Sequence, residues 1–110
     1  MAILDRFRTA SPRKHPDPAI RLAYVEALPI EDRDELATFA RDDDDAGVRR
    51  AAVAKVMEPS ALGGIARDDR DEAVRSQAVE MLRDIALDAF EGLSEQHAVA
   101  AVEALKALGD

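Results

Sequence analysis

Residues 45–53 read DAGVRRAAV, and this nine-residue pattern is the strongest indication of the fold in the sequence. It recurs without gaps as DPAIRLAYV at 17–25 and as DEAVRSQAV at 71–79. Each copy has an aspartate, a small residue two positions later, a branched aliphatic residue, an arginine and a final valine. The arginines of successive copies are 28 and 26 residues apart. Self-similarity at such a period is the signature of repeat architectures, so the chain is predicted to contain three copies of one helical unit.

Each copy is predicted to form an amphipathic α-helix. Apolar residues recur every four positions, as at Val74, Ala78 and Leu82, and this spacing places them on one face of a helix. The first residue of each copy is an aspartate, whose carboxylate can accept hydrogen bonds from the free N–H groups of the first turn. Pro18 suits the first helical position, and Pro29 ends the first helix.

A second helix follows in two of the units. Residues 36–42 read LATFARD and residues 62–68 read LGGIARD, again 26 apart. Helical hairpins are therefore predicted as the unit. Gly63 and Gly64 each lower helix propensity by about 1 kcal/mol relative to alanine, and we interpret them as small residues used for packing.

The third unit departs from this pattern. Polar residues occupy the expected core positions of its second helix, so a single longer helix from about Glu72 to Glu91 is predicted, ended by Gly92. Ser94 is expected to cap a last helix, Glu95 to Leu108, that stops at Gly109. Its apolar face is expected to consist of Ala98, Val102, Leu105 and Leu108.

The predicted fold is all-α, a short right-handed α-solenoid of three stacked helical hairpins in a single domain. Its parts are a lead-in at 1–15, repeats at 16–42, 43–68 and 69–91, and a terminal helix at 94–108. Within the lead-in, residues 2–8 are predicted to form a small amphipathic helix that covers the first repeat. A membrane-surface or partner-docking helix is the alternative for these residues.

The pattern Asp-x-x-(Val/Ile)-Arg-x-x-(Tyr/Ala), followed by Leu-x-x-(Phe/Ile)-Ala, resembles the HEAT repeats. It is most similar to the short bacterial HEAT-like repeats related to bilin lyases, over roughly residues 16–90. The resemblance implies a binding surface, usually for proteins. It also implies a structural charge ladder between neighbouring repeats, in which three aspartates pair with three arginines: Asp17, Asp45 and Asp71 with Arg21, Arg49 and Arg75. Because each aspartate precedes its arginine by four residues, pairing within one helix is equally open.

Composition excludes much chemistry. The 110 residues include no cysteine, so disulfides and thiolate sites are excluded. His15 and His97 are 82 positions apart, and each is interpreted as a solvated side chain rather than a ligand or base. The acidic run Asp42–Asp45 resembles the opening of a calcium loop, but alanine and valine stand at ligand positions five and twelve. No catalytic, cofactor-binding or metal site is predicted, and no cofactor.

These observations favour a non-catalytic protein-interaction or scaffold module in the cytoplasm, with a protein partner of unknown identity. A net charge of −8 and an aromatic content of 4% argue against nucleic acid, and no segment is apolar enough to suggest a membrane anchor. Two alternatives stay open. One is a HEAT-like DNA-binding or repair protein, and the other is a lyase-like factor that handles a cofactor.

Overall fold

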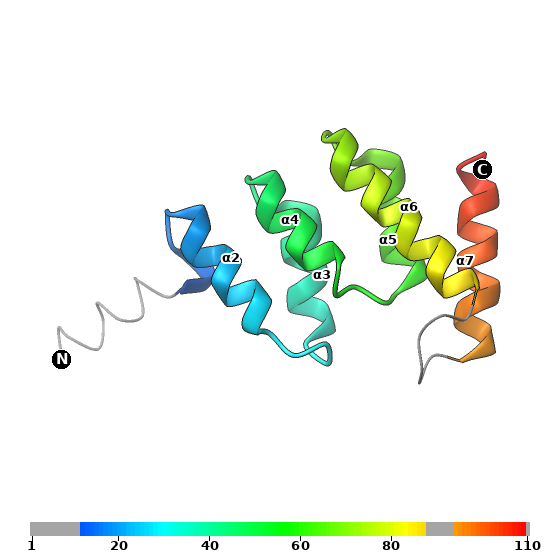
Figure 1. The fold of residues 1–110 in the computed structure, drawn as a ribbon, viewed down its shortest axis with the longest axis horizontal. Helices are drawn as coiled ribbons and strands as arrows, with labels where there is room; N and C mark the ends of the chain where they lie inside the picture. Colours follow the sequence, from blue (N-terminus) through cyan, green and yellow to red (C-terminus); the bar gives the residue numbers. More distant parts are fainter. Residues whose placement is uncertain (1–11, 88–93, 110) are drawn as a thin grey trace, which may run out of the picture.

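The computed structural model describes residues 12–87 and 94–109, and this part of the chain is all-α, which confirms the predicted class (Figure 1). The predicted helix at 2–8 and the predicted helical residues 88–91 lie outside the described ranges. A short 3-10 helix is followed by six α-helices: η1 (Pro12–Lys14), α2 (Pro18–Ala27), α3 (Arg33–Asp42), α4 (Ala46–Val53), α5 (Pro59–Asp68), α6 (Glu72–Ala86) and α7 (Glu95–Ala107).

The predicted helix starts are confirmed. The carboxylate of Asp17 accepts a hydrogen bond from the Ala19 amide at 2.9 Å, and Pro18 is the first residue of α2. In the same way Asp45 accepts from the Val48 amide at 3.0 Å. The third cap, Asp71, accepts from Val74 at 3.1 Å, and the Ser94 hydroxyl accepts from the His97 amide at 3.3 Å. Each cap satisfies one of the amides that a helix start leaves without a partner.

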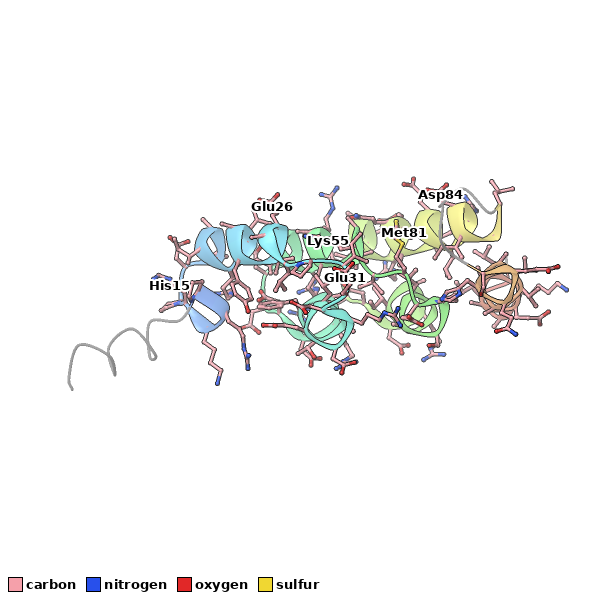
Figure 2. The ribbon with its side chains drawn as sticks, turned by 90° about the horizontal axis from the view of Figure 1, so that it is seen from below. His15, Glu26, Glu31, Lys55, Met81 and Asp84 are labelled. Carbon is pink, nitrogen blue, oxygen red and sulfur yellow. The ribbon has the colours of Figure 1, made fainter. Side chains whose placement is uncertain are left out.

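The helices lie in two rows. Figure 2 shows α2, α4 and α6 in one row and η1, α3, α5 and α7 in the other. Within the first row α2 packs on α4 and α4 on α6, and within the second α3 touches α5 and α5 packs on α7. The described chain measures 52 × 29 × 15 Å along its principal axes, so it is long and two helices thick.

The most extensive contacts between consecutive helices join α3 to α4, α5 to α6 and α6 to α7. The predicted hairpins instead combined α2 with α3 and α4 with α5, whereas α2 packs mainly on α4. Loop length accounts for the first two of the observed pairs, whereas α6 and α7 pack together across the longer connection 87–94. Residues 43–45 and 69–71 connect their helices in three residues, while the connections 28–32 and 54–58 take five. A shorter connection holds two antiparallel helices closer together.

One apolar core runs between the two rows. Every α-helix contributes to it, and its fully or almost fully buried side chains include Val25, Leu36, Val48, Leu62, Val74, Leu82 and Ala101. As predicted, α6 is longer than the earlier helices, and its stripe Val74, Ala78, Leu82 and Ile85 is buried. The helix ends at Ala86 with Leu87 as its C-cap, so it does not run on unbroken to Glu91 as predicted.

The apolar face of α7 differs from the prediction at one position. Ala101 is fully buried, whereas Val102 is 38% exposed. The face turned toward α5 and α6 therefore runs through Ala101 to Leu105 and Leu108, which pack against the core. The prediction followed a strict spacing of four residues. A helix has 3.6 residues per turn, so the buried stripe shifts by one position along α7. Gly109, at φ +83°, ends the helix as expected.

Candidate functional site

The turns that precede α2, α4 and α6 have the same geometry. In each copy a side chain accepts a hydrogen bond from the backbone N–H of the capping aspartate two positions later. The acceptors are His15 Nδ1, Asp43 Oδ1 and Asp69 Oδ1, at 3.0, 2.9 and 2.8 Å from the amide nitrogens of Asp17, Asp45 and Asp71. Two members of the acidic run at 42–45 are thus used locally, Asp43 as turn acceptor and Asp45 as helix cap.

The three predicted arginines all fold back onto these turns. Each lies six residues after the acceptor and donates from Nη1 to its backbone carbonyl: Arg21 to His15, Arg49 to Asp43 and Arg75 to Asp69. Arg49 Nη1 lies 2.7 Å from that carbonyl. The arginine of each unit therefore holds the turn that starts its own helix.

Two of the arginines also reach forward to the next turn. Arg21 meets Asp43 in two hydrogen bonds of 2.9 and 3.1 Å, and Arg49 meets Asp69 in two of 3.0 and 3.2 Å. The side chains of Arg49 and Asp69 are only 2% and 5% exposed. The hydrogen bond from Arg21 to Asp43 raises the pKa of the arginine, which keeps its charge.

The acid partners in this ladder are Asp43 and Asp69. The expected partners, Asp45 and Asp71, instead cap the helices that they precede. The reason is local: a capping carboxylate points at the amides of its own helix, while the residue two positions earlier faces the preceding unit. The sequence holds a signal for this, since Asp43 and Asp69 are also 26 apart. The four-aspartate run at 42–45 concealed which member makes the pair.

Lys55, which follows α4, contacts the C-terminal end of α2. The Lys55 ammonium donates to the backbone carbonyls of Val25, Glu26 and Leu28, the first two at 3.1 and 2.8 Å (Figure 2). Helix ends leave carbonyls without partners, and a cation there also opposes the negative end of the helix dipole. Sequence reasoning missed this contact because Lys55 has no counterpart in the other units.

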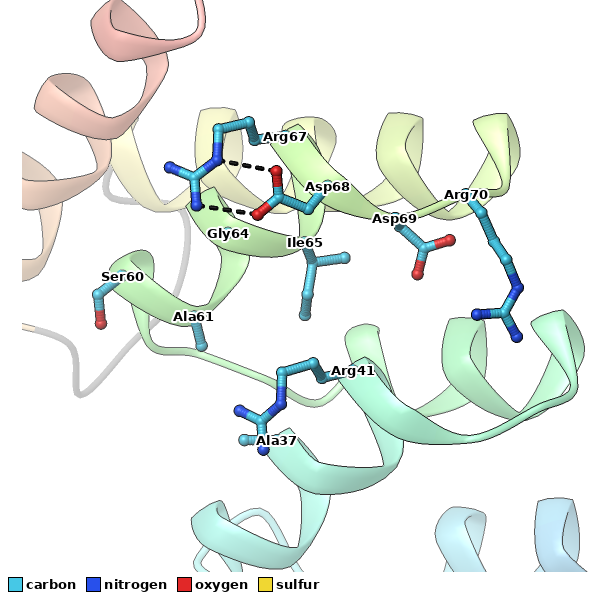
Figure 3. A pocket seen from close by; sticks show the side chains of 10 residues that line it. All are labelled: Ala37, Arg41, Ser60, Ala61, Gly64, Ile65, Arg67, Asp68, Asp69 and Arg70. Carbon is cyan, nitrogen blue, oxygen red and sulfur yellow. Dashed lines mark hydrogen bonds and ion pairs between the residues drawn. The ribbon is translucent and has the colours of Figure 1, made fainter.

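The ladder and Lys55 are thus structural, and the candidate site is a groove between α3 and α5 with a volume of about 390 Å³. Figure 3 shows its lining. Small and apolar residues make the floor, namely Ala37, Ala61, Gly64 and Ile65. The rim carries three arginines: Arg41 from α3, Arg67 from α5 and Arg70 from the turn after α5.

Gly64 keeps this groove open. It occupies the position that Thr38 has in the preceding unit, and a Cβ placed on it would meet no atom within 4 Å. Gly63 has a different surrounding, because a Cβ there would come 3.4 Å from the Ala104 side chain of α7. Of the two glycines, Gly63 therefore serves helix packing, as predicted, and Gly64 borders free space.

Two of the three rim arginines are paired with the next residue of the chain. Arg67 Nη2 lies 2.9 Å from Asp68 and Arg41 Nε lies 3.2 Å from Asp42, and all four side chains are more than half exposed. The hydrogen bond from Arg67 lowers the pKa of Asp68. Arg70 donates to the Asp44 carbonyl at 3.2 Å. Exposed pairs of this kind contribute little to stability, so these guanidinium groups can change partner at small cost.

The two histidines lie in separate units. His15 is the turn acceptor before α2, and His97 lies in the first turn of α7 with Nδ1 2.9 Å from the Ser94 hydroxyl. Within residues 12–87 and 94–109, no three His, Asp or Glu side chains gather in a way that would hold a metal ion.

None of the helices in the described ranges combines the length and the apolar character needed to cross a membrane. No protein-family model matches the sequence, and no curated protein or solved structure matches the chain significantly.

Proposed function

We propose that this chain is a non-catalytic protein-interaction module, built of HEAT-like repeats stacked as a short right-handed solenoid. Three features support the repeat architecture: the repeated turn, the arginine six residues after the acceptor in each turn, and the two-row order of the helices. The observation that carries the function is the groove between α3 and α5, an open surface site with a small-residue floor and a charged rim.

The surroundings of this groove support a binding role. Its walls, α3 and α5, contribute Leu36, Leu62 and Ile65 to one buried core, and the turn after α5 is bound to α4 by the buried Arg49–Asp69 pair. A surface that is ordered before binding loses less conformational entropy when a partner arrives. Among the described residues, every buried side-chain nitrogen and oxygen has a hydrogen-bond partner. The buried charges are thus used in contacts within the chain, whereas the exposed guanidinium groups of the rim are accessible to a partner.

The test is capture of a partner by the tagged full chain in extract of its native cells. The captured protein is identified by mass spectrometry, and the complex is rebuilt from purified components. We expect one stoichiometric protein whose binding reduces hydrogen exchange on α3 and α5. A bait carrying Arg49→Ala, which breaks the buried pair, is the control for adhesion to unfolded chain. Recovery of the folded bait without a protein partner would overturn the proposal, as would equal capture by the control bait.

A further inference from the structure

We propose that the groove between α3 and α5 receives an acidic segment of the partner protein. Its carboxylates pair with Arg41, Arg67 and Arg70, and a small apolar side chain lies on the floor beside Gly64. This inference rests on the proposed function and adds the chemistry of the partner.

Charge is the first argument. The chain carries a net charge of −8, yet three guanidinium groups surround this one groove. Of the two carboxylates that line it, Asp69 is already bonded to Arg49 and to the Asp71 amide. Asp68 is bonded to Arg67 alone among the rim arginines. A guanidinium presents a planar fork that matches the two oxygens of a carboxylate, so the rim is suited to carboxylates.

Exposure is the second argument. The side chains of Arg41 and Arg67 are 62% and 68% exposed, and their present partners are adjacent residues that are also exposed. A partner's carboxylate can therefore replace Asp42 or Asp68, which return to water. Arg49 cannot act in this way, because it is enclosed and bonded on several sides.

Shape is the third argument. The groove volume of about 390 Å³ falls in the usual range for ligand pockets, and Gly64 leaves its floor free of a side chain. A short segment with a few carboxylates can contact the three guanidinium groups without reaching beyond the groove. A nucleic acid would extend its phosphates over the acidic turn at 42–45 beside the rim and be repelled there.

The experiment selects binders from a displayed library of random short peptides, using the purified full chain. Enriched sequences are synthesised and their affinities measured by fluorescence anisotropy at low and high salt. We expect enriched peptides to share two or more acidic residues next to a small apolar residue. Their affinity should fall about two- to five-fold for Arg41→Gln and for Arg67→Gln, and further at high salt.

Two further variants separate the groove from the fold. Gly64→Leu fills the floor and is expected to lower affinity at least about ten-fold while the thermal midpoint stays unchanged or rises. Arg33→Gln is the matched control. Arg33 belongs to α3 and has an exposed acid neighbour, Glu58, at 3.6 Å, but it lies outside the groove, so affinity should not change.

Enriched peptides without acidic residues would overturn the inference, as would acidic peptides that bind Gly64→Leu as well as the original chain. The inference would also be overturned if a single-stranded oligonucleotide bound the original chain more tightly than the peptides did and lost affinity in the same groove variants. If no peptide is enriched while capture still yields a stoichiometric partner, the groove inference fails and the interaction module stands. If capture yields none, the proposed function fails, whatever the peptides show.

Discussion

Arg49 and Asp69 form a buried ion pair that joins α4 to the turn before α6. Two hydrogen bonds of 3.0 and 3.2 Å connect them, and Arg49 also donates to two carbonyls of its own turn, those of Asp43 and Asp44. Both partners have lost nearly all contact with water. Removal of either charge would therefore leave the other buried without its counter-ion.

Asp69→Ala is expected to lower the free energy of unfolding by about 3–5 kcal/mol, because it leaves the buried Arg49 cation without a counter-ion. Urea denaturation followed by circular dichroism measures the change. Asp68→Ala is the control one residue away, where the carboxylate is 66% exposed, and it should change the midpoint little. Equal effects of the two variants would contradict the role of burial.

The cap aspartates give a smaller effect. Asp45→Ala removes the acceptor of the Val48 amide at the start of α4 and is expected to cost about 1 kcal/mol. Asp45→Ser keeps an acceptor oxygen in reach of the same amide and should recover most of that loss. Both values come from chemical denaturation at neutral pH. Equal losses for alanine and serine would argue that charge rather than capping matters at this turn.

Replacement by alanine is expected to stabilise the chain at Gly64 but not at Gly47. Gly64→Ala adds a methyl group in free space within α5 and should stabilise the chain by up to about 1 kcal/mol. At Gly47 a Cβ would come 2.9 Å from the cap oxygen Asp45 Oδ2, so the gain in helix propensity is offset by a disturbed cap. Thermal unfolding of both variants tests this difference, and an equal rise of both midpoints would contradict it.

Lys55→Met keeps most of the side-chain stem but removes the ammonium that holds the last carbonyls of α2. Hydrogen bonds to a charged group contribute about 1.5–3 kcal/mol, and we expect a loss of that order. Hydrogen exchange should show the added opening at the end of α2, around Val25 and Leu28. Unchanged exchange there would mean that water replaces the ammonium without loss.

Tyr24 offers a spectroscopic test, because it is the chain's single tyrosine. Its hydroxyl donates to Glu35 Oε2 at 2.6 Å, and this hydrogen bond, with burial, raises the pKa of Tyr24. The protonated form is the one stabilised. Its contribution to stability is therefore complete below the unfolded-state pKa of about 10 and is lost as the pH rises through the higher folded-state pKa.

Ultraviolet absorbance of the phenolate should give a Tyr24 pKa above 10 in the folded chain. Glu35→Gln removes the negative acceptor and should bring the pKa back toward its ordinary value. A folded chain whose tyrosine titrates at the same pH with and without Glu35 would contradict the assigned cause.

Helix starts could be read from the sequence because they depend on local chemistry. An aspartate before an apolar stripe identified Asp17, Asp45 and Asp71 as caps, and the structure has them as caps. Partners across units depend on the direction in which a side chain leaves its turn. The spacing alone could not separate Asp43 from Asp45, because both aspartates repeat after 26 residues.

The groove could not be read from the sequence for a related reason. The sequence analysis treated Gly63 and Gly64 alike, since both lower helix propensity. Only the arrangement of the helices distinguishes them: α7 covers Gly63, while Gly64 faces the space between α3 and α5. Two of the three rim arginines, Arg41 and Arg67, were visible in a repeated Ala-Arg-Asp, but nothing in that pattern showed that they border one groove.

The burial of Arg49 also protects the chain against a particular error of assembly. Helices rich in alanine and valine are alike from unit to unit, so a helix that slid by one turn would still cover apolar surface. Such a slide would displace Arg49 by about 5.4 Å and separate it from Asp69. The mismatched arrangement would then enclose a lone cation, which penalises it far more than lost apolar contact would. The buried pair thus favours one register of α4 against the turn before α6 over a register shifted by one helical turn.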